Sequence, residues 1–111
     1  MISEIINNSM DADFGTLWIP LTDSSGKLNA TSLQLTWKNV TGILNGIINI
    51  YTANSQDYGS LALTIDVDSA TNENDTCMIT VYPMYYLLRI EFQKNGITGG
   101  LINGFLYYSE I

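Results

Sequence analysis

The fold class follows from residues 61–68, which read Leu61-Ala62-Leu63-Thr64-Ile65-Asp66-Val67-Asp68. Large apolar side chains occupy the odd positions, and small or polar side chains occupy the even positions. Side chains of a β-strand point alternately to the two faces of its sheet, so this period of two separates an apolar row from a polar row. The stretch therefore predicts a strand with one buried face.

The same alternation recurs along the chain, and no window longer than two turns has the spacing of an amphipathic helix. It predicts further strands at 14–19, 33–38, 47–53, 77–82, 86–93 and 101–109, with a short strand at 3–7. Turn-forming residues separate these segments, and Asn95-Gly96 fits a type I′ hairpin. Seven or eight short strands, with no room for crossover helices, predict an all-β fold: an antiparallel two-sheet β-sandwich resembling a jelly roll.

The chain length of 111 residues corresponds to one domain. We expect residues 14–111 to form a single β-sandwich domain. Residues 1–13 are acidic and lack firm periodicity, so we expect either an extended N-terminal arm or a short edge strand there. No secretory signal and no run of about 18 apolar residues is recognisable, so no membrane association is expected.

Composition excludes several classes of function. Eleven acidic residues against four basic ones give a net charge of −7, which disfavours binding to nucleic acid or to anionic lipid. The absence of histidine excludes a Ser-His-Asp triad, a Cys-His pair and histidine metal sites. Cys77 alone forms neither an internal disulfide nor a thiolate zinc site. We therefore expect no enzymatic activity and no cofactor.

Acidic residues gather at one place, with Asp66 and Asp68 followed by Glu73 and Asp75. Such oxygen ligands suit Ca²⁺, but the order departs from the EF-hand pattern because Ala70 occupies a ligand position. A solvated loop is favoured, and no metal site is expected. Paired carboxylates also serve glycoside hydrolysis, but no spacing here singles out a pair.

Aromatic side chains are the candidate contact residues. Trp37 shares its phase with Leu33 and Leu35 and is expected in the core. The candidates for an exposed interface are Trp18, Tyr82, Tyr85, Tyr107 and Tyr108. Tyrosine is enriched in protein interfaces because it combines apolar area with a polar tip, and aromatic rings on a sandwich face also stack on sugar rings.

Five segments together resemble small β-sandwich proteins and modules from the virions of tailed bacteriophages. They are a strand ending in Trp at 33–37, a Gly-x-x-x-Gly stretch at 42–46, a strand and loop at 48–59, a Tyr- and Arg-bearing strand at 86–90, and Thr-Gly-Gly-Leu at 98–101. The loop at 54–57 departs from the tighter form of the family. The resemblance implies a head-decoration, fibre or tail component and carries over no catalytic residue.

The sequence thus predicts a structural virion protein, most specifically an auxiliary capsid protein that decorates and stabilises the shell. Its expected partners are the major capsid protein or other virion proteins, and further copies of itself, because small chains gain stability by oligomerising. The low charged fraction of 14% fits a neutral surface made for such contacts. The alternative is a carbohydrate-binding module or a fibre or tail adhesion protein that contacts a glycan.

Overall fold

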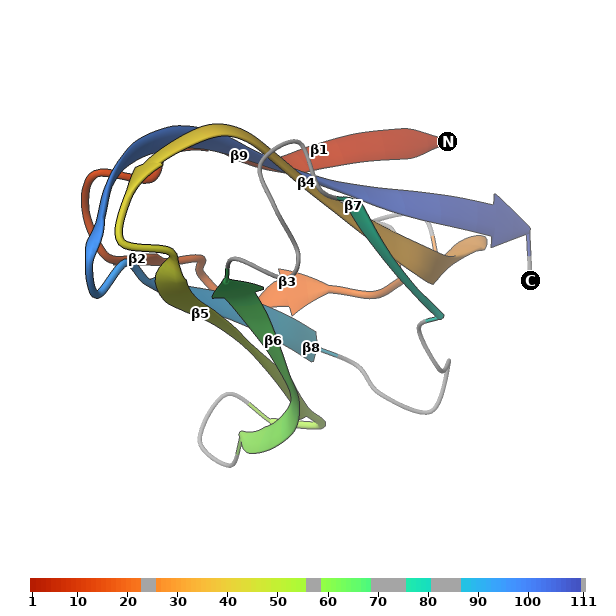
Figure 1. Cartoon of the computed structure of the whole chain (residues 1–111). Helices are drawn as coiled ribbons and strands as arrows, with labels where there is room; N and C mark the ends of the chain where they lie inside the picture. The colour runs from red at the N-terminus through yellow and green to blue at the C-terminus, as the bar shows by residue number, and fades with distance from the viewer. Residues whose placement is uncertain (23–25, 56–58, 69–75, 81–86, 111) are drawn as a thin grey trace.

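A computed structural model describes residues 1–22, 26–55, 59–68, 76–80 and 87–110. These residues contain no helix, and their strands are β1 (Ile2–Ser9), β2 (Phe14–Gly15), β3 (Ile19–Pro20), β4 (Leu28–Gly42), β5 (Asn45–Ala53), β6 (Ser60–Asp68), β7 (Thr76–Thr80), β8 (Leu87–Gln93) and β9 (Ile97–Glu110). The first sheet has the order β1-β9-β4-β7, and the second has the order β2-β8-β5-β6, with β3 also paired to β8. The predicted antiparallel two-sheet β-sandwich is confirmed (Figure 1).

A single long ribbon of two strands organises both sheets. β4 and β9 pair from Leu28 opposite Glu110 to Gly42 opposite Ile97. At the second of these ends β4 leads into β5, and β8 leads into β9, and Figure 1 shows the two chains curving over together. β5 and β8 are paired in turn, with Ile50 opposite Ile90. The folded ribbon therefore supplies the two central strands of each sheet.

The core lies between these central strands. Its buried side chains include Leu33, Leu35, Trp37, Ile48, Ile50, Leu88, Ile90, Phe92, Ile102 and Leu106. The alternation predicted for 33–38 and for 86–93 places the core side chains of β4 and β8 inward, as expected. Full burial of one large apolar side chain stabilises the fold by about 1.5–3 kcal/mol, so the alternating pattern is the main source of the sheet arrangement.

The N-terminal segment forms β1, an edge strand of the first sheet. It pairs with β9 from Ile2 opposite Tyr107 to Ser9 opposite Leu101, with a bulge at Ile5. Ile6 and Met10 are buried in the core. The amino group of Met1 also donates a hydrogen bond to the Tyr108 carbonyl at 3.0 Å. Residues 1–10 are thus part of the sandwich in this structure.

The single strand predicted at 14–19 is divided into β2 and β3. Thr16, which lies between them, exchanges hydrogen bonds with Ile90. Its backbone N–H donates to the Ile90 carbonyl at 2.8 Å, and its hydroxyl accepts from the Ile90 N–H at 3.0 Å. Because a side-chain oxygen replaces the backbone carbonyl in this pairing, the regular ladder stops at Gly15 and resumes at Ile19.

The hairpin predicted at Asn95-Gly96 is wrong, although a turn is present. Ile97 N–H donates to the Lys94 carbonyl at 2.9 Å, and Asn95 has a φ of 48°. Gly96 has no positive φ, whereas a type I′ turn needs one at both central residues. The turn joins β8 to β9, which belong to opposite sheets. It is a corner of the sandwich and not the end of a hairpin.

The buried row predicted for 61–68 is only partly correct. Val67 is fully buried and Ile65 is half-buried, but Leu63 and Leu61 are 41% and 55% exposed. The pairing of β6 with β5 shifts here, since Ile50 lies opposite Leu63 and Tyr51 lies opposite Leu61. Ala62 is the extra residue of a β-bulge, and such an insertion reverses the face to which the following side chains point.

Candidate functional site

The outer face of the first sheet carries the candidate contact site. Along β9, Ile102, Leu106 and Tyr108 point into the core, so Phe105 and Tyr107 between them point outward. Tyr107 is 47% exposed and lies opposite Ile2 of β1 and Ser32 of β4. The two aromatic side chains therefore stand on the solvent side of three adjacent strands.

These residues line a shallow depression of about 450 Å³, formed by Ile2, Ser32, Gln34, Phe105 and Tyr107. A volume of that order is within the range of small-molecule sites, which combine apolar walls with a few polar groups. The amide of Gln34 and the hydroxyl of Ser32 supply neutral hydrogen-bonding groups next to the two rings. The depression can bind a neutral apolar or amphipathic surface, because none of its lining residues within the described part of the chain is charged.

A polar border lies farther along the same face. The Asn103 amide donates to Glu4 Oε2 and to Asn7 Oδ1, both at 3.4 Å. Asn103 comes from β9, and its two acceptors come from β1. These exposed hydrogen bonds hold the edge strand to β9 beside the depression.

Tyr108 is not part of an exposed strip, and the exposure predicted for it is wrong. It is 6% exposed, and its hydroxyl donates to the Pro20 carbonyl at 3.0 Å. Adjacent residues of a strand point to opposite faces, so Tyr107 and Tyr108 cannot both face solvent. Tyr108 instead fixes the segment that contains β3 against the first sheet.

Trp18 is half-buried and packs on the backbone at the start of β6. A Cβ added to Gly59 would lie 2.5 Å from Trp18 Cη2, so the indole fits there because Gly59 has no side chain. Trp18 and Tyr107 therefore lie on different sheets. Tyr82 and Tyr85, the two remaining candidates, lie outside the described residues.

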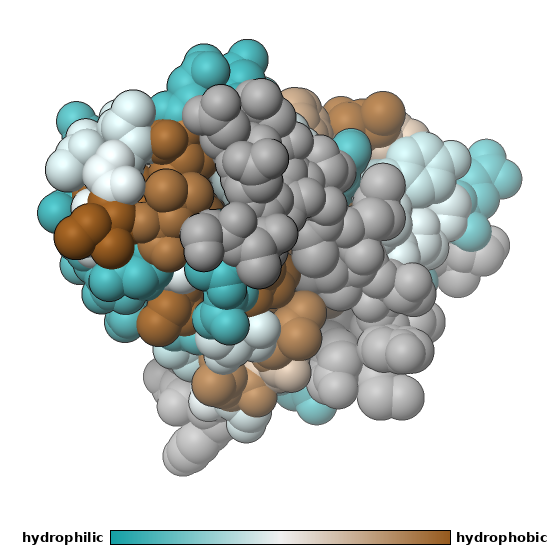
Figure 2. Space-filling model, viewed as in Figure 1, coloured by the Kyte–Doolittle hydropathy of each residue, from teal (hydrophilic) through white to brown (hydrophobic). Residues whose placement is uncertain are grey.

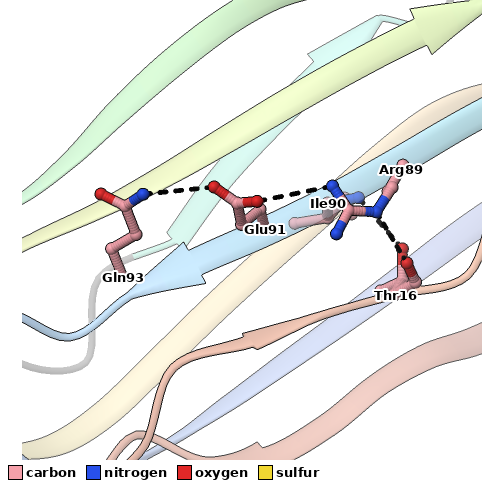
Figure 3. Close-up of polar contacts among 5 residues, drawn as sticks. All are labelled: Thr16, Arg89, Ile90, Glu91 and Gln93. Carbon is pink, nitrogen blue, oxygen red and sulfur yellow. Dashed lines mark hydrogen bonds and ion pairs between the residues drawn. The ribbon is translucent and has the colours of Figure 1, made fainter. Parts of the chain in front are cut away.

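A second polar cluster, on the outer face of the second sheet, was only partly visible in the sequence. Arg89 and Glu91 lie two residues apart on β8, and Arg89 Nη1 lies 3.5 Å from Glu91 Oε2. Figure 3 shows this pair extended by Gln93, whose amide donates to Glu91 Oε1 at 3.2 Å, and by the Thr16 carbonyl, which accepts from Arg89 Nε at 3.1 Å. The cluster ties the segment after β2 to the sheet.

Two further contacts of Arg89 are not readable from local sequence. Its guanidinium lies 5.9 Å from the centre of the Tyr51 ring, on the neighbouring strand β5. An added Cβ on Gly15 would lie 2.6 Å from Arg89 Nη2, so a larger residue there would displace the end of the arginine side chain. The strand register brings these residues together. A single outward arginine on a predicted strand was the available signal.

Apolar residues are exposed on the second sheet as well. Figure 2 shows brown hydrophobic residues on the front of the molecule, over the region where Figure 1 places β5 and β6. Leu61 and Leu63 of β6 are the exposed large apolar side chains of that strand. Within the described residues, β6 pairs with β5 on one side and with no strand on the other.

The predicted acidic loop cannot be placed, because residues 69–75 lie outside the described part of the chain. Among the described residues, no three His, Cys, Asp or Glu side chains are grouped so that they could hold a metal ion. No helix in the described ranges is long and apolar enough to cross a membrane. Among the surfaces that the described residues offer, the apolar depression on the first sheet and the strand edges suit binding.

Comparisons with known proteins find a similarity to solved structures. No family model and no curated protein sequence matches the chain. A solved structure, the crystal structure of the infectious bursal disease virus VP2 subviral particle, is similar at 15% sequence identity with a TM-score of 0.41. The match covers 95% of this chain and 32% of that one, so the chain spans about a third of its length. This likeness assigns neither a family nor a function.

Proposed function

We propose that this chain is a structural protein of a virion, most specifically an auxiliary capsid protein of a tailed bacteriophage that decorates and stabilises the shell. The observation that carries the proposal is the outer face of the first sheet, where Tyr107, Phe105 and Ile2 surround a depression whose described lining residues are all uncharged. Interface cores are depleted in charge and enriched in such aromatic side chains. The tailed-phage assignment itself comes from the sequence resemblance.

In this role the protein acts by contact alone, without catalysis, cofactor or nucleic acid. The depression would receive an apolar side chain of the major capsid protein or of another virion protein. Repetition of the contact over a capsid lattice multiplies a weak affinity into strong attachment. The net charge of −7 also fits a protein partner better than a nucleic-acid partner.

The test is co-sedimentation of the purified protein with capsids from the phage lysate in which the gene is expressed, together with mass spectrometry of those virions. Tyr107→Ala should remove binding. Leu17→Ala is the matched control, because Leu17 is 87% exposed and does not line the depression. Absence of the protein from virions, together with no co-sedimentation, would refute the proposal.

A carbohydrate-binding role is the second candidate, favoured by the same depression. Aromatic rings beside the Gln34 amide and the Ser32 hydroxyl are the groups that stack on and hydrogen-bond to a sugar. Trp37 is buried and Trp18 lies on the other sheet, so tryptophan fluorescence is a poor reporter for this face. A glycan array followed by calorimetry distinguishes the candidates, since a sugar binder should lose affinity in Gln34→Ala.

A further inference from the structure

We infer that β6 is a homodimerisation edge, at which two copies of this chain pair their β6 strands antiparallel about Thr64 and join their second sheets into one. The inference deepens the self-association part of the proposed function and rests on that part alone. It involves a different surface from the depression on the first sheet, so a dimer could still present both depressions to a partner.

β6 lies at the edge of the second sheet and can pair with a further strand. Within the described residues, β6 has β5 on one side and no strand on the other, so its free side carries backbone N–H and C=O groups with no strand partner. Exposed edges of this kind bind further strands unless charge, proline or a short length prevents it. β6 is nine residues long, contains no proline, and exposes Leu61 and Leu63. Its two carboxylates, Asp66 and Asp68, lie towards one end of the strand, so they restrict the register of pairing.

Backbone geometry limits the ways in which two copies of β6 can pair. The backbone N–H and C=O groups of successive residues point to opposite sides of a strand. In an antiparallel pair, two residues that lie directly opposite each other either both form hydrogen bonds across the pair or both form none. Two identical antiparallel strands related by a two-fold axis therefore meet with some residue opposite its own copy. The residue that lies on the two-fold axis therefore fixes the register of the whole strand pair.

The sequence of β6 selects Thr64 as the residue on the axis. About Thr64, Leu63 meets Ile65 and Ala62 meets Asp66. The two large apolar side chains therefore face each other, and the Asp66 carboxylate faces the small side chain of Ala62. Strand pairing of this composition is favourable, and a threonine pair at the centre adds to it.

Neighbouring registers are worse for two separate reasons. Centring the axis on Leu63 places the Ala62 bulge next to it in both copies, where it disturbs the ladder. Centring it on Ile65 brings the two Asp66 side chains into diagonal contact, and centring it on Asp66 opposes them directly. Like charges in those positions destabilise a strand pair.

The bulge also limits the strength of the contact. Regular pairing about Thr64 extends over residues 62–66. Such a short strand pair buries less surface area than a standard protein–protein interface, so the dimer should be weak and concentration-dependent. This agrees with a protein that assembles on a lattice, where each subunit contact is repeated. It also defines the concentration range in which the test must be made.

The experiment is sedimentation equilibrium of the purified full chain from about 10 μM to about 1 mM, the range in which weak strand pairing is measurable. The wild-type mass should rise from one copy of 12.3 kDa towards two copies. Thr64→Glu and Thr64→Lys each place like charges opposite each other and should weaken self-association by about fivefold or more. An equimolar mixture of the two variants should restore the dimer, because Glu and Lys then face each other across the axis.

The matched control is Thr98→Glu. The Thr64 hydroxyl donates to Asn49 Oδ1 at 2.9 Å. Thr98 is likewise an exposed strand threonine with a side-chain hydrogen bond, to Thr41 at 3.1 Å, and it lies away from β6. This variant has the same charge change and should dimerise like wild type. Unchanged circular dichroism in all variants separates loss of the interface from loss of the fold.

Each alternative outcome overturns a stated part of the inference. A wild-type chain that stays monomeric to about 1 mM means that this edge does not bind a second copy. Weakened single variants without rescue in the mixture mean that Thr64 is not on the axis, and higher oligomers mean pairing with a different strand. Capsid co-sedimentation is measured separately, so a failed dimer and a failed virion role remain distinguishable.

Discussion

Gly42 is the residue at which the long ribbon leaves the first sheet. Its φ is 90°, and an added Cβ would lie 2.5 Å from the Gly96 carbonyl oxygen and 2.8 Å from the Thr98 nitrogen. Gly26 also has a positive φ, of 72°, but nothing lies within 4 Å of its Cβ position. The two glycines therefore separate conformational strain from steric collision.

We predict that Gly42→Ala destabilises the protein by about 3–5 kcal/mol, because the colliding atoms are backbone atoms of the paired strand. Gly26→Ala should cost about 1–2 kcal/mol, the strain of a left-handed backbone alone. Urea denaturation followed by circular dichroism measures both. Equal costs would mean that the corner opens freely.

Tyr107 and Tyr108 give a second prediction at the scale of single residues. Tyr108→Phe should cost about 1 kcal/mol through its lost hydrogen bond to Pro20, and Tyr108→Ala should cost about 3–5 kcal/mol as a core truncation. Tyr107→Ala should change the free energy of unfolding by less than about 0.5 kcal/mol, as expected for a surface position. Thermal melts of the three variants check the inward and outward phase of β9.

Two connections between strands, β4–β5 and β8–β9, form the corner between the sheets, and Asn45 joins them by hydrogen bonds. Asn45 Oδ1 accepts from the Gly96 N–H at 2.6 Å, and its backbone carbonyl accepts from the Asn95 amide at 2.7 Å. Ile43 N–H also donates to the Gly96 carbonyl at 2.9 Å. The β4–β5 connection is thus hydrogen-bonded to the β8–β9 connection.

We expect Asn45→Ala to lower the free energy of unfolding by about 1 kcal/mol, since the Gly96 N–H loses its side-chain acceptor. Asn45→Asp keeps an acceptor oxygen and should retain most of the stability. Chemical denaturation of the two variants measures the difference. If both variants lose the same amount, the side-chain oxygen is not what stabilises the corner.

The strands themselves could be predicted from the sequence, because alternation is a local property. Residues 33–38 and 87–93 lie in strands whose apolar rows face the core, as their pattern indicates. Strand connections depend on partners far away in the chain. The turn at Asn95-Gly96 was recognisable as a turn, but nothing local shows that β8 and β9 lie in opposite sheets.

Strand register and β-bulges could not be predicted from the sequence, because they too depend on partners far away in the chain. Leu61 has the same neighbours in sequence whether or not β5 pairs past an extra Ala62, yet the bulge exposes it. Thr16 likewise looks like a strand residue, and its hydroxyl ends β2 by accepting from Ile90. At the candidate site, the sequence analysis expected both Tyr107 and Tyr108 to be exposed. Strand alternation allows only one of two adjacent side chains to face solvent, and packing decides that it is Tyr107.

At the scale of the whole molecule, two apolar surfaces stand out among the described residues. They are the depression on the first sheet and the exposed leucines Leu61 and Leu63 at the β6 edge of the second sheet, and the charged fraction of the chain is 14%. Charged residues are few, and within the described residues no strand covers the outer edge of β6. These surfaces therefore favour association with another protein surface. The two surfaces lie on different sheets, so a subunit could use both at once.

The place of residues 1–13 gives a last prediction for the molecule as a whole. An extended arm could be removed without harm to the sandwich. In this structure, however, the segment contributes β1 and buries Ile6 and Met10, and Met10 N–H donates to the Gly100 carbonyl at 2.9 Å. Two buried apolar side chains contribute about 1.5–3 kcal/mol each, which is a large share of a net stability of about 5–15 kcal/mol.

Deletion of residues 1–13 should therefore lower the melting temperature steeply or abolish cooperative unfolding, as measured by circular dichroism. It also uncovers the edge of β9 and should promote aggregation. Ile2→Ser is the matched control, because Ile2 is 69% exposed and its replacement leaves β1 in place. A deletion variant that melts like wild type would show that β1 contributes nothing to the first sheet, and the segment would then be the arm that its acidic, irregular sequence also allows.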